Sequence, residues 1–163
     1  MVIIFKSDKS LVVTSKSTII QKENLADKLK FYIPKVYEDN DLSLFTVTMY
    51  YKDGGNAVYS ETLIANESDK DNYLLFTLPL TTEITEVAGT VTLWLVLSCN
   101  SDIGSGAATL TEIHSEKVSF EIEKWDEYKL YSETSAKVQA LESKISSLES
   151  EIEQLKALVT VSA

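Results

Sequence analysis

The sequence predicts an all-β sandwich or barrel followed by a C-terminal α-helical coiled coil. Short segments of alternating apolar and polar residues, separated by turn signals, recur through residues 1–123. No helical periodicity is visible before residue 124. From residue 138 the apolar residues recur every three or four positions, which is the heptad spacing of a coiled coil. Short strands with frequent turns are typical of sandwiches and barrels, and the heptads add a helical tail.

The middle of the β region carries the clearest strands. Residues 28–34 alternate, and residues 44–50 and 58–64 form a predicted β-hairpin around a loop that contains glycine. Residues 90–99 are the most hydrophobic segment and are apolar on both faces, with Trp94 on the second face. A strand that is apolar on both faces is expected at the centre of its sheet. Together with less regular segments, this gives about seven to nine strands.

The heptad pattern of the tail predicts that copies of the chain associate. Its a positions are β-branched and its d positions are leucine: Val138, Leu141, Ile145, Leu148, Ile152, Leu155 and Val159. This stripe is too narrow to be one face of a globular core, so we expect it to pack against another copy. The alternative is a single amphipathic helix that packs on its own domain. The b, c and f positions disfavour it because they carry no second apolar stripe.

The charges beside the stripe predict a parallel arrangement. In a parallel coiled coil, each g residue lies beside the e residue five positions later on the partner helix. All three such pairs join opposite charges: Lys137–Glu142, Lys144–Glu149 and Glu151–Lys156. The chain therefore divides into a β domain (1–123), a helical joint without glycine or proline (124–137) and a parallel coiled-coil oligomerisation segment (138–163).

Composition argues against nucleic-acid and membrane partners. The formal net charge is −10, and all 15 basic residues are lysine. An acidic chain without arginine repels a phosphate backbone and lacks the side chain best suited to bidentate phosphate recognition. The N-terminal segment Met1–Phe5 is too short for the apolar region of a signal peptide, and no segment reaches transmembrane length. We therefore expect assembly in a cytoplasm.

The side chains that could act as nucleophiles, bases or metal ligands do not form a recognisable catalytic or metal-binding set. Cys99 and His114 are the only cysteine and histidine, and no nucleophile motif surrounds either of them. We expect Cys99 to be a small buried apolar residue and His114 to be solvated. The acidic segments 38–41 and 67–71 lack the glycine and final glutamate of a calcium loop. The sequence therefore predicts no enzyme activity, no catalytic residues, no metal and no cofactor.

The tyrosines suggest carbohydrate binding as the main alternative function. The chain has eight tyrosines, of which Tyr50, Tyr51, Tyr59 and Tyr73 lie in or near predicted strands. Aromatic side chains on a β-sandwich can stack on sugar rings, whereas half-buried tyrosine is also common on any sheet. A carbohydrate-binding module on a coiled-coil stalk therefore stays open as an alternative.

Several segments resemble a family of phage structural proteins. Leu25–Lys35, Asp41–Ser43, Tyr73–Pro79 and Ala88–Leu95 resemble the N-terminal domains of baseplate upper proteins from phages and prophages of Gram-positive bacteria. The resemblance covers about residues 20–125 and consists of hydrophobic patterns with a few glycines and prolines. It implies an immunoglobulin-like β-sandwich that docks on a virion, followed by helices that trimerise and carry a receptor-binding or fibre part.

With the resemblance, the predicted fold class is an all-β immunoglobulin-like sandwich followed by a C-terminal α-helical coiled coil. The predicted function is that of a non-enzymatic phage virion structural protein, either a capsid decoration or head fibre or a tail or baseplate adaptor. Its expected partners are other virion proteins and further copies of itself. No receptor-binding head follows the heptads before Ala163, which favours an adaptor, decoration or short-fibre role. A cytosolic scaffold or chaperone is a further alternative.

The residues of the heptads and the family resemblance predict different numbers of helices in the coiled coil. The β-branched a positions and leucine d positions favour two strands. The resemblance favours three, and we expect a trimer.

Overall fold

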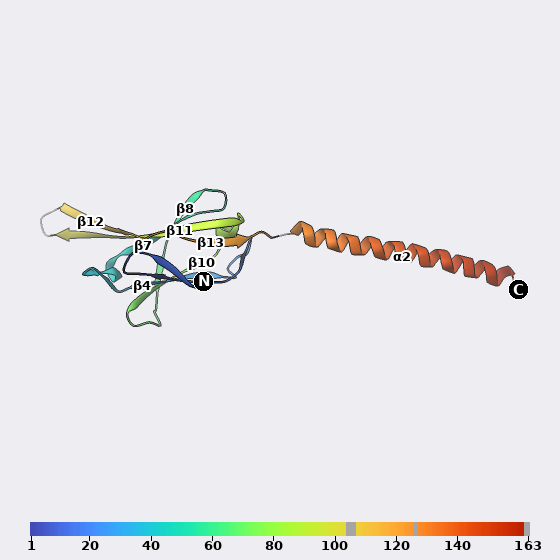
Figure 1. The fold of residues 1–163 in the computed structure, drawn as a ribbon, viewed down its shortest axis with the longest axis horizontal. Helices are drawn as coiled ribbons and strands as arrows, with labels where there is room; N and C mark the ends of the chain where they lie inside the picture. Colours follow the sequence, from blue (N-terminus) through green and yellow to red (C-terminus); the bar gives the residue numbers. More distant parts are fainter. Residues whose placement is uncertain (104–106, 126, 162–163) are drawn as a thin grey trace. The chain divides into compact units, whose positions relative to one another are not determined.

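The computed structural model describes residues 1–103, 107–125 and 127–161. The chain consists of two units, Met1–Trp125 and Asp126–Ala163. The first unit contains the strands, and the second contains the long helix α2, Glu127–Val161 (Figure 1). The loop predicted around Gly104 and Gly106 lies outside the described residues.

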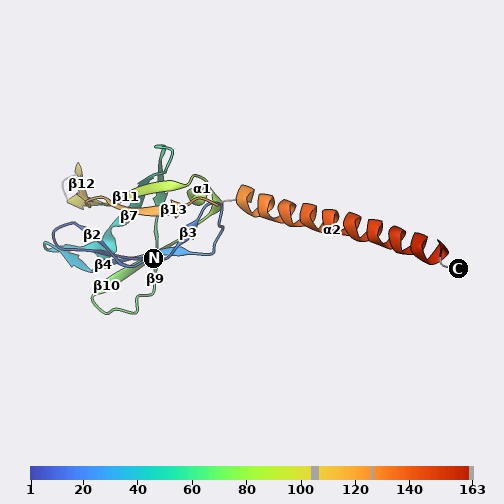
Figure 2. The same ribbon diagram turned by 45° about the vertical axis from the view of Figure 1, so that its right-hand side comes forward.

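Two β-sheets form the first unit, and they lie as two layers in Figure 2. The five-stranded sheet has the order β2-β1-β4-β10-β9, with the bounds β1 Val2–Phe5, β2 Leu11–Ser15, β4 Lys28–Pro34, β9 Ile64–Asn66 and β10 Tyr73–Pro79. The six-stranded sheet has the order β3-β13-β11-β7-β8, and β12 pairs with β11. Its bounds are β3 Ile19–Ile20, β7 Thr46–Lys52, β8 Val58–Thr62, β11 Gly89–Ile103, β12 Ala107–His114 and β13 Val118–Glu123.

Smaller elements connect these strands. A two-stranded ribbon joins β5 (Val36–Tyr37) to β6 (Asn40–Asp41), and a 3₁₀ turn follows at Leu42–Leu44. The helix α1 spans only Thr82–Thr85. These two short helical elements are the exception to the prediction that no helix precedes residue 124. At four residues or fewer, each is too short to produce a helical period in the sequence.

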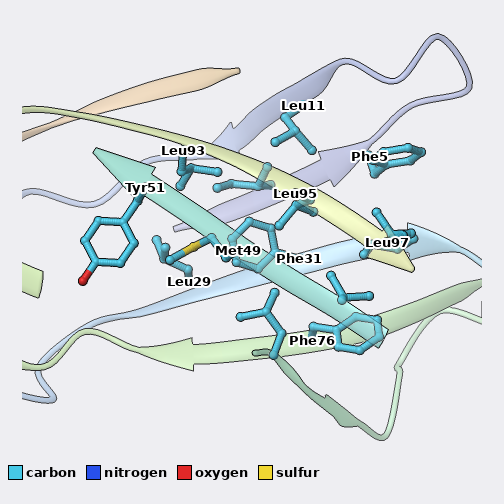
Figure 3. Packing of buried hydrophobic residues seen from close by; sticks show 14 of the residues in the cluster. Phe5, Leu11, Leu29, Phe31, Met49, Tyr51, Phe76, Leu93, Leu95 and Leu97 are labelled. Atoms are coloured by element: carbon cyan, nitrogen blue, oxygen red, sulfur yellow. The ribbon is translucent and has the colours of Figure 1, made fainter. Parts of the chain in front are cut away.

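The core lies between the two sheets, which makes the unit a sandwich rather than a barrel. Alternate side chains of β4 point into it from one sheet, including Leu29 and Phe31. Alternate side chains of β11 point into it from the other, and Leu93, Leu95 and Leu97 are 0 % exposed (Figure 3). The structure therefore confirms a mostly-β chain with a C-terminal helix.

The strand β11 occupies the central position predicted for residues 90–99, since it pairs with β7, β13 and β12. Its second face is not part of the core. Trp94 is half-buried on that face and stacks on Tyr50 of β7, with 5.8 Å between ring centroids and 13° between ring planes. Cys99 was predicted to be buried, but it is only half-buried. It lies beyond Leu97, the last residue of β11 in the core cluster.

Two features of the β region differ from the sequence prediction. The single strand predicted over residues 58–64 is two strands that belong to different sheets, because β8 pairs with β7 whereas β9 pairs with β10. Leu63, between them, is buried and donates its backbone N–H to the Val47 carbonyl oxygen at 2.8 Å. The second difference is β12, which the sequence did not reveal. Among its described side chains only Ile113 is buried, so the alternation is weak.

One tight backbone contact positions the loop after β7. A Cβ atom on Gly54 would overlap the Ala88 carbonyl oxygen and lie 2.9 Å from the Ala88 carbonyl carbon. We expect Gly54→Ala to lower the free energy of unfolding by about 1–3 kcal/mol, because the backbones must move apart. Urea denaturation of the full chain measures this loss.

Gly55→Ala is the matched control for this substitution. A Cβ at Gly55 would meet only the Asp53 carboxylate, at 3.3 Å, and the Val87 side chain, at 3.7 Å. We expect a smaller loss of stability at Gly55 than at Gly54. Equal unfolding midpoints for the two variants would show that the Gly54–Ala88 contact does not constrain the loop.

Candidate functional site

The candidate oligomerisation surface is the apolar stripe of α2. The helix has 35 residues, so at about 1.5 Å per residue it is about 52 Å long. It is continuous through residues 137 and 138, where the predicted joint meets the predicted coiled coil. All side chains from residue 134 to residue 161 are exposed.

The seven heptad residues are exposed to similar extents along this helix. Their exposed fractions range from 48 % at Val138 to 71 % at Val159. The middle of the stripe, Ile145, Leu148 and Ile152, is between 50 % and 55 % exposed. Isolated surface leucines are common in proteins, whereas a row of apolar side chains over three heptads is typical of an interaction surface.

The sequence analysis did not include two further apolar residues near the end of the helix. Leu158 is 65 % exposed at a g position, and Val161 is 85 % exposed. The sequence alone could have identified Leu158, because it is an apolar residue at a g position, whereas the other g positions of the heptads are charged. Leu158 widens the apolar stripe at its last heptad.

The charged residues flanking the stripe are also exposed, and one of them has a partner within the helix. The Lys156 Nζ atom lies 3.2 Å from the Glu153 Oε1 atom, an ion pair between residues three apart. Lys156 is the residue predicted to pair with Glu151 of another copy. Exposed ion pairs of this kind contribute roughly 0.2–0.5 kcal/mol, so association can replace the local pair at little cost.

Cys99 and His114 do not form a nucleophile–base pair. In the β11–β12 ladder, Cys99 lies opposite Thr111, and His114 lies opposite Val96. Three residue steps separate the two positions, which is about 10 Å along a strand. The His114 side chain is 60 % exposed, and its Nε2 atom lies 3.6 Å from a Glu112 carboxylate oxygen. The structure thus places His114 in solvent, as the sequence predicts.

The two acidic segments shape turns. Glu38 and Asp39 have positive φ angles of 42° and 64° in the turn between β5 and β6. The Asp41 carboxylate accepts hydrogen bonds from the backbone N–H and the hydroxyl of Ser43, and these bonds lower the pKa of Asp41. Among the residues that the structure describes, no three His, Cys, Asp or Glu side chains are grouped so that they could hold a metal ion.

The second acidic segment is tied to the core by Asp69. The Tyr32 hydroxyl donates a hydrogen bond of 2.7 Å to the Asp69 carboxylate, and this bond holds the pKa of Asp69 below its ordinary value of 3.8. Because the folded-state pKa is lowered, the ionised carboxylate stabilises the fold above about pH 4 and loses this effect as the pH falls. We expect Asp69→Asn to reduce the difference in thermal unfolding midpoint between pH 7 and pH 3.

Asp71→Asn is the control for this pH effect, since Asp71 is a neighbouring exposed carboxylate in the same loop. It should leave the pH dependence close to that of the unchanged chain. Identical pH dependence in the Asp69→Asn variant would show that the bond from Tyr32 does not stabilise the fold.

The four tyrosines considered for sugar binding lie in different environments. Tyr51 is buried, Tyr50 and Tyr73 are half-buried, and Tyr59 is 47 % exposed. Tyr51 and Tyr59 stack with their ring centroids 5.3 Å apart. Of these four tyrosines only Tyr59 is exposed, whereas Tyr50, stacked on Trp94, and Tyr73 are each partly accessible.

No helix in the described chain combines the length and the apolar character needed to span a membrane. Comparison with known protein families finds no family that matches the sequence, and comparison with curated proteins finds no match. Among solved structures, the chain is similar to the N-terminal domain of phage TP901-1 ORF48. The alignment covers 76 % of this chain and 97 % of that chain, with 12 % sequence identity and a TM-score of 0.41.

Proposed function

We propose that this chain is a non-enzymatic structural protein of a phage virion. In this proposal the β-sandwich docks on other virion proteins, and α2 joins copies of the chain through a parallel coiled coil. The observation that carries the association of copies is the exposed stripe of seven apolar residues on α2. Complete burial of one fully exposed side chain of this kind contributes roughly 1.5–3 kcal/mol, so burial of the stripe between copies favours association.

The proposed orientation is parallel, and the proposed assembly is a trimer. The orientation rests on the three pairs of opposite charge between g and e positions, which only a parallel arrangement brings together. The trimer, like the virion setting, rests on the sequence resemblance to baseplate upper proteins. A coiled coil of three heptads is marginal by itself, so the sandwich or its docking partner is expected to add to the stability of the assembly.

The strand order supports an immunoglobulin-like sandwich as part of the proposal. Variable-type immunoglobulin domains have one sheet in the order ABED and another that adds C′ to the strands G, F and C. The order β1-β4-β10-β9 corresponds to ABED, and β13-β11-β7-β8 corresponds to GFCC′. The short β3 runs parallel to the last strand, β13. The chain departs from the pattern in that β1 runs parallel to β4 and carries an additional partner, β2.

Disulfide crosslinking tests the proposed orientation. In a Cys99→Ser background, Val159→Cys should form a disulfide between copies under mild oxidation, because a parallel coil places the two Val159 positions side by side. An antiparallel coil would instead bring position 159 near position 138 of the partner. Crosslinking that occurs only when Val138→Cys and Val159→Cys chains are mixed would contradict the parallel arrangement.

Mass spectrometry of purified particles tests the virion setting. We expect the chain to copurify with phage particles in a fixed ratio to the other structural proteins. Absence of the chain from particles, together with its accumulation in the host cytoplasm, would favour a scaffold or chaperone role.

Saccharide binding is a second candidate function, and the Tyr50–Trp94 stack favours it. The two rings are nearly parallel and stacked on the outer face of the six-stranded sheet, and Lys117 Nζ lies 4.9 Å from the Trp94 ring centroid. A flat aromatic surface of this kind can hold a sugar ring. Titration with host cell-wall polysaccharide should quench the Trp94 fluorescence in a Trp125→Phe background, and Tyr50→Ala should abolish this response. An unchanged fluorescence spectrum would remove this candidate.

A further inference from the structure

A groove with a cavity volume of about 460 Å³ lies beside the edge strand β8. Two stacked tyrosines and several carboxylates form its walls: Tyr51, Tyr59, Asp53, Glu61, Glu83 and Glu86. They come from β7, β8, the loop after β7 and the segment around α1. The sequence analysis did not group them, because Glu83 and Glu86 lie more than about 20 residues after β8 in the sequence.

The groove exists because one sheet face extends beyond the core. Tyr59 and Glu61 of β8 lie opposite Tyr51 and Met49 of β7 in the ladder, so they share the inner face of the sheet. Tyr51 and Met49 are buried, whereas Tyr59 is exposed and Glu61 is only partly covered. The contact between Gly54 and Ala88 holds the loop after β7 against the segment that follows α1. This contact keeps the loop that carries Asp53 next to the segment that carries Glu86.

The charges around the groove are of one sign and lack partners. None of the carboxylates of Glu61, Glu83 and Glu86 forms an ion pair with a residue in the described parts of the chain. Asp53 is buried, and one of its carboxylate oxygens accepts hydrogen bonds from the backbone N–H groups of Gly55 and Ala57, each at 2.9 Å. The groove thus has a negative potential that no lysine of the described chain neutralises by direct contact.

Tyr51 gives an independent indication of a ligand. Its side chain is 3 % exposed, and its hydroxyl forms no hydrogen bond within the described residues. Figure 3 shows this hydroxyl directed away from Met49 and the other core side chains. Burial raises the pKa of Tyr51 to about 12, and the charges of Glu61, Glu83 and Asp53 add to the effect. The Tyr51 hydroxyl lines the groove, where it is accessible and free to hydrogen-bond with a ligand.

We infer that this groove binds the guanidinium group of an arginine side chain on a partner protein. A planar cation can stack on the exposed Tyr59 ring while its N–H groups donate to Glu61, Glu83 and the Tyr51 hydroxyl. The arginine must come from another protein, because this chain contains none. The inference rests on the proposed docking function and gives the partner of the sandwich a definite chemistry.

The charge of the groove favours this ligand over a neutral sugar or a metal ion. A neutral sugar would gain nothing from the negative potential of Glu61, Glu83 and Glu86, whereas a cation is attracted by it. The carboxylates are also not grouped closely enough to hold a metal ion, as far as the described residues show. A guanidinium group matches both the aromatic and the acidic walls.

The test uses the full chain with N-acetyl-L-arginine amide as the probe and N-acetyl-L-citrulline amide as its uncharged isostere. We expect the arginine probe to shift the amide NMR signals of Tyr59, Glu61 and Glu83 with a Kd on the order of 1 mM, since it provides one side chain. The citrulline probe should produce no saturable shift. Saturable binding should also lower the pKa of Tyr51, measured by ultraviolet absorbance.

Two variants and a control locate the binding. Glu61→Gln and Glu83→Gln should each weaken binding at least about fivefold, because each removes one charged acceptor. Glu67→Gln, at an exposed position after β9, should leave the Kd unchanged. Equal binding of both probes, or equal weakening by Glu67→Gln, would overturn the inference. Shifts of the same amides by a cell-wall saccharide, without shifts by arginine, would also overturn it in favour of a sugar.

The mass of the chain in solution, measured on the same samples, separates this inference from the proposed function. An oligomer that binds neither probe would leave the proposed assembly in place and refute the arginine groove. A monomer that binds the arginine probe would refute the assembly and retain the groove.

Discussion

We expect Leu148→Asp to convert the proposed oligomer into a monomer at micromolar concentrations, and light scattering coupled to size exclusion measures this change. Leu148 occupies a d position in the middle of the stripe and is 50 % exposed in the single helix. In the coiled coil it would be enclosed by the neighbouring helices, so a carboxylate there loses its hydration. An uncompensated buried charge costs about 3–5 kcal/mol, which corresponds to more than a hundredfold in the association constant.

Ser150→Asp is the control, because Ser150 occupies an f position on the opposite side of the same helical turn. It introduces the same charge at an exposed site, and we expect the oligomer to persist. An unchanged mass for Leu148→Asp would show that the heptad register is wrong. Dissociation of both variants would show that added charge, rather than its position, weakens the assembly.

Leu95→Ala should produce the largest loss of stability in the sandwich. Leu95 is 0 % exposed at the centre of β11, between the two sheets. Truncation of a buried leucine removes favourable contacts and leaves a cavity, with a cost of about 2–5 kcal/mol. Urea denaturation followed by tryptophan fluorescence measures this loss, because Trp94 lies next to Leu95 in the same strand.

Trp94→Ala provides the comparison that distinguishes the two faces of β11. Trp94 is half-buried outside the core, so its loss removes the stacking on Tyr50 and part of a partly exposed surface. The stacking contributes about 0.5–1.5 kcal/mol, and we expect a smaller total loss than for Leu95→Ala. Circular dichroism is the appropriate probe for this variant. A loss as large as that of Leu95→Ala would contradict the placement of Trp94 on the outer face.

The sequence was sufficient to predict which residues of the main strands face the core. In β11 the alternation of the sequence separates the buried Leu93, Leu95 and Leu97 from their half-buried neighbours, and in β7 it separates Val47 and Met49 from Thr48 and Tyr50. This succeeds because a half-buried strand has a period of two residues. The outer face of β11 was harder to interpret, because an aromatic residue such as Trp94 is apolar whether it enters a core or stacks on a surface.

Strand partners and short elements could not be predicted in the same way. Alternation identifies a face but does not identify the neighbouring strand, so the exchange of sheets between β8 and β9 was not evident. The acidic groove was also beyond sequence reasoning, because Glu83 and Glu86 reach Tyr59 only through the tertiary fold. The register of α2 was predictable because it is local, whereas the number and direction of its partners are properties of an assembly.

The proposed coiled coil and the proposed arginine groove would reinforce each other. A groove that holds one arginine side chain binds weakly by itself, with a Kd on the order of 1 mM. When a coiled coil joins several sandwiches, each further docking contact becomes intramolecular, and the overall affinity can increase by about 10²–10⁴. An assembly of this kind would dock stably only where the partner presents several copies of its site, as symmetric particles do.

Sedimentation equilibrium of the full chain at about 10–100 µM, a range in which weak association is visible, tests the central claim most directly. The account predicts a single species with three times the 18.2 kDa mass of the chain. A mass twice that of the chain would keep the coiled coil and replace the trimer by a dimer. A species of 18.2 kDa throughout this range would contradict the claim that α2 joins copies of the chain.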